Sequence, residues 1–256
     1  MARRVAAAAV LLLVLGRPLA PQARAPSPLP APHPQRLSFV SAERTRAYYL
    51  LLPPTANDAS PAPLLVLLHG SYASPLEVLT PWRDVAAEAG VILVAPQSLD
   101  SYGWRIHDDG PAFLRDLVEE VARQHAIDRR RVYLFGHSAG AVHALTLGML
   151  ESQYFAAVAV HAGAFTDPGS FRVLPLARRK IPLWIVAGER DRQMPPSAVR
   201  ETAAALRAAG FPLTLTTLAD HDHDYSGELA ARIAADAWAF LAPLRLEEAP
   251  RYQPYR

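Results

Sequence analysis

RVYLFGHSAG, residues Arg131 to Gly140, joins an apolar run directly to a G-x-S-x-G pentapeptide centred on Ser138. A stretch of small, helix-forming residues follows over 141–150. This order of strand, tight turn and helix is typical of a nucleophile elbow, in which a sharp turn exposes the serine hydroxyl. Glycine suits the two outer positions because a side chain there would collide with neighbouring backbone. The pentapeptide alone would arise by chance in about one chain in ten of this length, so the prediction depends on its strand and helix flanks.

Candidate partners for Ser138 come after two later strand-like segments. A serine hydroxyl is a poor nucleophile at neutral pH and needs a base to take its proton and an acid to orient that base. The segments are 181–188 and 213–218, and the candidates are Glu189 and Asp191 after the first and His221 and His223 after the second. The carboxyl ends of parallel strands share one edge of a sheet, where open α/β sheets bind their ligands. We therefore expect one carboxylate and one imidazole to converge on Ser138.

The loop HGSY, residues 69–72, follows another apolar run and is suited to hold an oxyanion. In hydrolases with a nucleophile elbow, such a loop gives one backbone N–H, and the residue after the nucleophile gives the other. We expect these donors to be Ser71, with Tyr72 as the alternative, and Ala139. The ring of His69 is expected to fix the loop through a backbone hydrogen bond.

These features together resemble the α/β-hydrolases. Within that superfamily the chain is similar to secreted esterases related to poly(3-hydroxybutyrate) depolymerases and feruloyl esterases. The resemblance extends over roughly residues 36–244, and the matching residues are Leu67-Leu68-His69-Gly70, Ile127-Asp128 with Arg131-Val132-Tyr133, the elbow Gly136 to Gly140, and Gly188 with Asp191. The segment around the base departs from the family's usual pattern of a Gly-rich stretch before it and a tryptophan after it, because residues 219–225 read ADHDHDY.

The resemblance implies a catalytic triad and no cofactor. Asp191 has the spacing of the family's acid, while Glu189 lies nearer the strand. His221 is the imidazole closest to the strand end and aligns best with the family's base, so we predict it as the base and keep His223 as the alternative. We expect no metal, because the His and Asp residues over 220–224 have no third strong cluster of ligand types near them in the sequence.

The composition fits one domain and excludes several classes of function. The chain has 256 residues, of which 51% are hydrophobic, and this is enough for one sizeable core. Its net charge is only +2 and its basic residues are scattered, which argues against nucleic acid as a partner. It has no cysteine, which excludes a disulfide, a thiolate nucleophile and a lipidated cysteine.

The N-terminus predicts export. Residues 1–25 combine a charged start with an apolar run too short to span a membrane, and they read as a signal peptide. A Pro/Ala-rich linker over 26–35 follows, then the hydrolase domain over 36–244 and a C-terminal tail over 245–256. Within this tail, residues 247–256 read as loosely ordered. The protein is therefore expected to be secreted or periplasmic with no membrane span left after cleavage, and an uncleaved N-terminal anchor is the alternative.

Strand and helix patterns alternate through the domain. They predict an α/β fold with a mostly parallel, eight-stranded sheet covered by helices on both faces, opened by a hairpin whose strands flank residues 42–46. About twenty residues separate the strand ending near His161 from the one starting at Ile181, so we expect no large cap domain and an exposed cleft at Ser138. Asp108 and Asp109 are expected to be N-caps of the helix that follows them.

We predict a secreted serine hydrolase that cleaves a small-molecule or polymeric carboxylic ester through an acyl-enzyme intermediate. Two alternatives stay open: a serine peptidase or thioesterase with the same triad, and a non-catalytic hydrolase fold that serves as a binding protein. Trp104 and His107 are expected either to line an aromatic pocket or to anchor a packed loop. The sequence leaves the acyl chain, the alcohol and the oligomeric state open.

Overall fold

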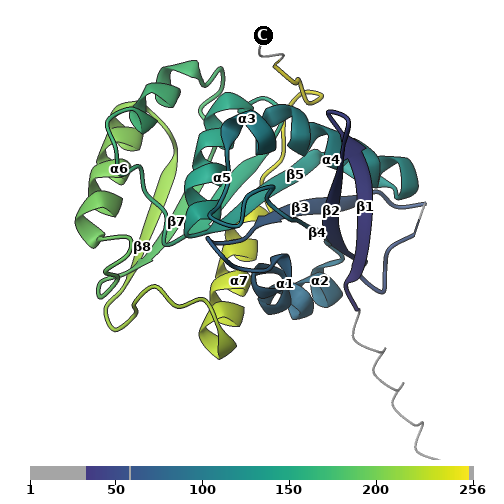
Figure 1. The fold of residues 1–256 in the computed structure, drawn as a ribbon, viewed down its shortest axis with the longest axis horizontal. Coiled ribbons are helices and arrows are strands. Elements are labelled where there is room, and N and C mark those ends of the chain that lie inside the picture. The colour runs from purple at the N-terminus through teal and green to yellow at the C-terminus, as the bar shows by residue number, and fades with distance from the viewer. Residues whose placement is uncertain (1–32, 58, 254–256) are drawn as a thin grey trace, which may run out of the picture. The chain divides into compact units, whose positions relative to one another are not determined.

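The computed structural model describes residues 33–57 and 59–253. Within them eight strands form one sheet in the order β1-β2-β4-β3-β5-β6-β7-β8 (Figure 1). The strands are β1 (Gln35–Ser41), β2 (Arg44–Leu51), β3 (Ala62–Leu68), β4 (Ile92–Pro96), β5 (Ile127–His137), β6 (Ala157–His161), β7 (Leu183–Gly188) and β8 (Leu213–Leu218). β1 pairs antiparallel with β2 and β2 with β4, and the other pairs are parallel. The predicted mostly parallel eight-stranded sheet is confirmed.

Helices connect these strands. They are α1 (Pro75–Leu79), α2 (Arg83–Ala89), α3 (Ile106–Asp109), α4 (Pro111–Gln124), α5 (Ala139–Leu150), α6 (Pro196–Ala208) and α7 (Gly227–Leu241), with two 3-10 helices, η1 (Thr80–Trp82) and η2 (Ser170–Leu176). The sequence patterns did not predict α1, α3 or the two 3-10 helices. α1 has five residues and begins at a capping box, in which Leu76 N–H donates to Ser74 Oγ and Ser74 N–H donates to Glu77 Oε1. Such local hydrogen bonds stabilise a helix too short to show an apolar period.

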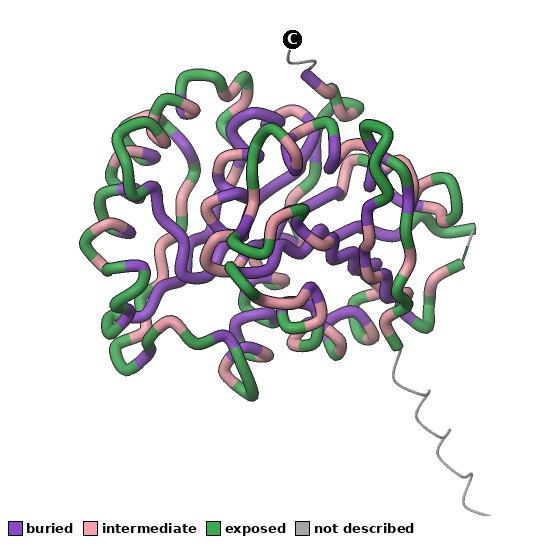
Figure 2. Tube along the Cα trace, in the orientation of Figure 1, coloured by how far each residue is buried: buried purple, intermediate pink, exposed green. Residues whose placement is uncertain are grey.

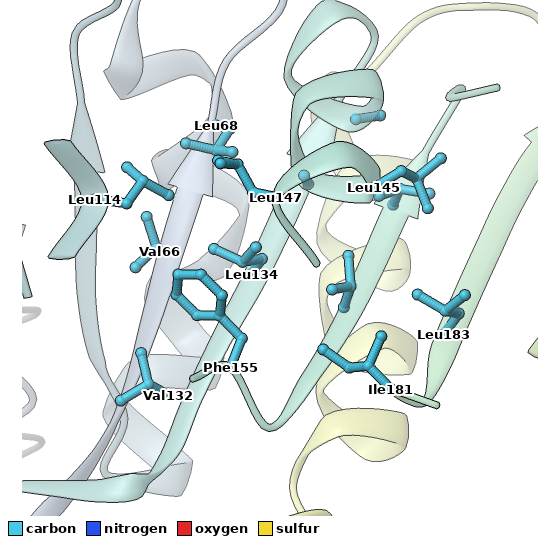
Figure 3. Close-up of a cluster of buried hydrophobic side chains, with 14 of the residues drawn as sticks. Val66, Leu68, Leu114, Val132, Leu134, Leu145, Leu147, Phe155, Ile181 and Leu183 are labelled. Atoms are coloured by element: carbon cyan, nitrogen blue, oxygen red, sulfur yellow. The ribbon is translucent and has the colours of Figure 1, made fainter. Parts of the chain in front are cut away.

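Both faces of the sheet are buried, because alternate side chains of its central strands point to opposite faces. Along β3, Leu64, Val66 and Leu68 pack in one hydrophobic layer and Leu65 and Leu67 in the other. The first layer also contains side chains of α4, α5 and α6, and the second contains those of α1, α2 and α7. Figure 3 shows part of the first layer, and Figure 2 shows the buried strands running through the middle of the domain. The predicted coverage by helices on both faces is confirmed.

The first hairpin turns more tightly than the sequence suggested. Ala42 and Glu43 have φ angles of 46° and 61°, and β2 begins at the next residue, so the predicted gap over 42–46 is too long. Two successive left-handed residues make a two-residue turn whose twist matches that of the strands. Because β2 starts early, Arg46 belongs to the strand and lies buried.

Neither Asp108 nor Asp109 caps α4, whose N-cap is Gly110 without a side-chain capping bond. The carboxylate of Asp109 is fully buried and forms a salt bridge with Arg46 of β2. It also accepts backbone N–H groups from the segment 99–105. Asp109 therefore fixes the loop after β4, and the N-cap prediction was wrong because its partner lies far away in the sequence.

The C-terminal segment packs on the domain up to the last described residue. Leu246 N–H donates to Arg130 O at 2.9 Å, and Arg130 Nε–H donates back to Leu246 O at 2.7 Å. Farther on, the backbone N–H of Gln253 donates to a carboxylate oxygen of Glu151 at 3.0 Å. The expectation of a loosely ordered tail is therefore wrong for residues 247–253.

The connection from β6 to β7 holds η2 and loops, and the described chain carries no large cap over the carboxyl ends of the strands, as predicted. Among residues 33–57 and 59–253, no helix has the length and apolar character needed to cross a membrane. The predicted signal peptide, 1–25, and most of the predicted linker, 26–35, lie outside the described residues.

Candidate active site

β5 and α5 meet at a turn that gives Ser138 a positive φ, with φ 55° and ψ −120°. Such backbone strain is uncommon outside glycine and is typical of a nucleophile elbow. A Cβ atom on Gly136 would lie 2.2 Å from Gly140 O, and one on Gly140 would lie 2.1 Å from Leu68 O. Both outer positions of the pentapeptide therefore require glycine.

Ser138, His223 and Asp191 form one hydrogen-bonded chain. Ser138 Oγ–H donates to His223 Nε2 at 2.8 Å, and His223 Nδ1–H donates to Asp191 Oδ2 at 2.8 Å. The structure thus places His223, the alternative imidazole, between the hydroxyl and the carboxylate. The preference for His221 at this position was wrong.

His221 turns inward instead. Its N–H donates to Leu218 O at 3.3 Å, so the chain turns sharply as soon as β8 ends. Its ring is buried, and its Nε2 atom lies 2.8 Å from Nε2 of His161 at the end of β6. From His221 to Tyr225 burial alternates residue by residue, as in an extended chain. The imidazole nearer the end of β8, His221, therefore points into the core. The next inward-facing imidazole, His223, reaches the nucleophile.

Asp191 is buried and held in place by its neighbours. Its second carboxylate oxygen, Oδ1, accepts the backbone N–H groups of Gln193 at 2.9 Å and Met194 at 2.8 Å. Glu189, the alternative acid, pairs with Arg200 on the surface at 3.2 Å. The structure therefore brings the predicted acid, and not its alternative, to the imidazole.

Two backbone N–H groups near Ser138 are available to an oxyanion. Among the described residues, no acceptor contacts the N–H of Ser71 or of Ala139. The N–H of Tyr72 already donates to Ser101 O at 2.7 Å. The alternative donor is therefore occupied, and the predicted pair, Ser71 and Ala139, is free to bind.

His69 fixes the loop that carries these donors. Its Nδ1–H donates to Gly70 O at 2.7 Å, because its Nε2 atom accepts the N–H of Ser98 at 3.2 Å. Trp104 Nε1–H donates to His69 O at 2.8 Å, and the indole ring stacks on His143. Trp104 is thus a loop anchor and also lines a small cavity beside α5, whereas the side chain of His107 is exposed.

Ser138 and His223 lie in an open cleft of about 1240 Å³, bounded by the loop 70–73, by Arg190, Arg192 and Gln193, and by the loop 220–227. A smaller cavity of about 440 Å³ borders Ala139, between α5 and the segment 100–106. Exposed rings of Tyr72 and Tyr102 contact each other at 5.0 Å beside these openings. The expected exposed cleft is present.

Three histidines lie next to the triad, and the sequence had predicted a role in the reaction for only one of them, the expected base. Burial, reinforced by neighbouring imidazoles, lowers the pKa of His137 to about 4 and that of His161 to about 2, so both are neutral at neutral pH. The third is His221. His137 also stacks on Tyr225, whose hydroxyl accepts a hydrogen bond from Trp82 Nε1–H. In the part of the chain that the structure describes, no group of three or more His, Cys, Asp or Glu side chains is arranged to hold a metal ion.

A mostly parallel sheet, an elbow after its fifth strand and a Ser–His–Asp arrangement at the carboxyl ends of the strands define an α/β-hydrolase fold. Residues 46–174 match the family described as esterase PHB depolymerase. The chain belongs to this family, which confirms the resemblance drawn from its motifs.

Similar proteins agree with this assignment. NocK of Nocardia uniformis subsp. tsuyamanensis, which carries the name of an esterase, is 31% identical over 183 residues, covering 67% of this chain and 52% of NocK. The bifunctional acetylxylan esterase/xylanase XynS20E of Neocallimastix patriciarum is 27% identical over 143 residues, covering 53% of this chain and 20% of XynS20E. The chain thus matches about half of the first relative and a fifth of the second. A solved ferulic acid esterase has the same fold, with a TM-score of 0.68, 19% identity, and coverage of 83% of this chain and 98% of its own.

Proposed function

We propose that the protein is a serine hydrolase that cleaves carboxylic esters through an acyl-enzyme intermediate. The observation that carries this proposal is the hydrogen-bonded chain from Ser138 Oγ through His223 to Asp191, with both distances at 2.8 Å. In this mechanism Ser138 Oγ attacks the ester carbonyl while His223 Nε2 takes its proton. His223 then gives the proton to the departing alkoxide, and water hydrolyses the acyl-enzyme by the same steps.

Asp191 orients the base. Its Oδ2 atom accepts from His223 Nδ1–H, which keeps Nε2 unprotonated and facing Ser138. The carboxylate stabilises the imidazolium that forms during proton transfer and does not take the proton itself. Two backbone N–H groups on Oδ1 hold the carboxylate still, so the base does not have to reorganise during the reaction.

The N–H groups of Ser71 and Ala139 stabilise the tetrahedral oxyanion. Both are without an acceptor among the described residues, and the strained turn at Ser138 places the second of them beside the nucleophile. Each such donor contributes about 2.7–4 kcal/mol to transition-state stabilisation in comparable hydrolases.

The open cleft favours an ester that is either small or part of a larger polymer. No cap closes over Ser138 within the described chain, so a substrate can enter from the side and extend beyond the cleft. The mechanism needs no cofactor. Amides and thioesters fit the same triad chemistry, so a serine peptidase or a thioesterase is the alternative within the same reaction class.

The test compares hydrolysis of short-chain aryl esters, matched amides and matched thioesters by the wild type and by Ser138→Ala. The proposal expects the esters to be turned over fastest and Ser138→Ala to lose this activity. Preference for amides or thioesters supports the alternative activity. Absence of turnover together with absence of fluorophosphonate labelling supports a binding protein on a hydrolase fold.

We also propose that the protein acts outside the cytoplasm, secreted or periplasmic, after removal of residues 1–25. The charged start and short apolar run of this segment support export, and so does the assignment to a family of esterases. N-terminal sequencing of protein recovered from the medium and the periplasm tests this, and a mature protein that keeps Met1 contradicts it and supports the uncleaved anchor.

A further inference from the structure

A chain of three imidazoles connects the loop that carries His223 to the elbow that carries Ser138. His221 Nε2 lies 2.8 Å from His161 Nε2, and His161 Nδ1 lies 2.9 Å from His137 Nδ1. His137 immediately precedes Ser138, and His221 lies two residues before His223. The three imidazoles thus join segments that are remote in sequence, at the ends of β5, β6 and β8.

The protons in this chain are ordered by its hydrogen bonds. A neutral imidazole has one N–H donor and one acceptor nitrogen. If His221 Nε2–H donates to His161, then His161 Nδ1–H donates to His137, and the third N–H is on His137 Nε2. In the reverse order, the third N–H is on His221 Nδ1. In either order both contacts are N–H···N hydrogen bonds, and His161 uses both of its ring nitrogens within the chain.

The central ring is fully buried and depends on the other two for its hydrogen bonds. Among the described residues, the ring nitrogens of His161 contact only His137 and His221. Leaving a buried donor or acceptor without a partner is unfavourable, so the three rings stabilise one another's positions. Removing the central ring would leave a nitrogen without a partner on each side.

The elbow end of the chain also supports the base directly. The ring of His137 contacts the ring of His223 with centroids 5.1 Å apart, and it stacks on His161 at 5.0 Å and on Tyr225 at 5.2 Å. His223 therefore rests on a ring whose orientation is fixed by His161. The charged or titratable groups that act on this cluster are Asp191, Asp224 and His223 itself.

We propose that His137, His161 and His221 are positioning residues, whose two imidazole–imidazole hydrogen bonds hold the His223 loop against the nucleophile elbow and so set the distance from Ser138 Oγ to His223 Nε2. This inference rests on the proposed function, in which His223 is the base. A small misplacement of a base relative to its nucleophile can lower the rate about 100-fold. The three imidazoles therefore affect the rate of the chemical step.

Backbone contacts provide a competing explanation for the position of the loop. Arg190 N–H donates to His221 O at 2.9 Å, and a Cβ atom on Gly188 would lie 2.1 Å from the same oxygen. These contacts fix the backbone at His221 without any imidazole. The experiment must therefore remove the hydrogen bonds between the imidazoles and leave this backbone packing intact.

His161→Phe does this, because phenylalanine keeps a planar ring and removes both ring nitrogens. The matched control is Thr202→Val, which removes another fully buried hydrogen bond, from Phe165 N–H to Thr202 Oγ1 at 2.9 Å, away from the triad. We expect His161→Phe to lower kcat about 10- to 100-fold per fluorophosphonate-titrated site while KM changes less than about threefold. Thr202→Val is expected to lose stability and keep kcat.

Nuclear magnetic resonance of ¹⁵N-histidine protein at pH 8 gives a second readout. We expect scalar couplings across both N–H···N bonds in the wild type and in Ser138→Ala, and their loss in His161→Phe. A folded His161→Phe protein with kcat within about threefold of the wild type overturns the proposal. The absence of either coupling in the wild type also overturns it. If His161→Phe does not fold, His221→Phe carries the same expectation and the same refuting result.

Failure of the proposed function gives a different result. If Ser138→Ala keeps full ester turnover, the triad assignment is wrong whatever the couplings show. If Ser138→Ala is inactive and His161→Phe is fully active, the triad stands and the positioning role is wrong.

Discussion

Acid should destabilise the fold through its buried imidazoles, and His143 is the simplest case. This side chain is 5% exposed, and its Nε2–H donates to Asp109 O at 2.8 Å. Burial lowers its pKa from 6.5 to about 4, and the hydrogen bond to Asp109 only partly opposes this shift. In the folded protein His143 is therefore neutral over a range in which an unfolded chain would bind a proton.

The sign and size of the effect follow from this difference. Because the folded pKa is lower than the unfolded value, the stability contributed by His143 is fully present above pH 6.5 and is lost as the pH falls toward 4. One pKa unit corresponds to about 1.4 kcal/mol, and pH 5 lies about 1.5 units below the unfolded pKa. The loss from this one side chain between pH 8 and pH 5 is therefore about 2 kcal/mol.

Urea denaturation of the wild type and His143→Phe at both pH values, followed by tryptophan fluorescence, measures this loss of stability. Phenylalanine cannot titrate, so the wild type loses stability that the variant keeps, and other ionisable groups cancel in the comparison. Between pH 8 and pH 5 we expect the wild type to lose about 2 kcal/mol more unfolding free energy than the variant. A difference that stays constant within about 0.5 kcal/mol would refute the reasoning.

Four substitutions test other parts of the structure. Asp191→Asn should lower kcat about 10⁴-fold in an ester assay, and Glu189→Gln should leave kcat unchanged; the reverse pattern would assign the acid to the surface carboxylate. Gly188→Ala would place a Cβ atom 2.1 Å from His221 O, so we expect lower kcat with helical circular dichroism retained, and full activity would show that the loop can shift freely. Arg46→Met leaves a buried carboxylate unpaired and should lower the unfolding free energy in urea by about 3–5 kcal/mol, a loss that an unchanged denaturation midpoint would exclude.

The sheet and the nucleophile could be predicted from the sequence because their signals are local. Continuous apolar runs such as 63–68 and 181–188 indicate strands buried on both faces, and the structure confirms both as β3 and β7. The position of Ser138 between a strand and a helix also depends on neighbouring residues alone. The elbow geometry then follows from glycines that lie two residues to either side.

The choice between His221 and His223 depended on information that lies elsewhere in the chain. Both rings face the same way along an extended loop, so spacing alone could not separate them. The deciding partner is His161, which accepts or donates a hydrogen bond at the position nearest the strand end. A histidine at the end of a buried strand carries no sequence signal that it will pair with another imidazole sixty residues away.

The same reason explains the errors at Asp109 and at the C-terminus. An aspartate just before a helix is usually a cap, but Arg46 on an antiparallel strand draws it into a buried ion pair. The polar segment 245–253 lacks an apolar period, yet its backbone finds acceptors and donors on β5 and at the end of α5. Both contacts depend on topology and not on local pattern.

The central claim is that Ser138 is a nucleophile activated by His223. Peptide mapping by mass spectrometry after treatment with a fluorophosphonate tests it most directly. We expect a single adduct on Ser138, formed quickly in the wild type, formed more slowly in His221→Ala, and absent on the same timescale in His223→Ala. An adduct on another serine, or normal labelling of Ser138 in His223→Ala, would contradict the account.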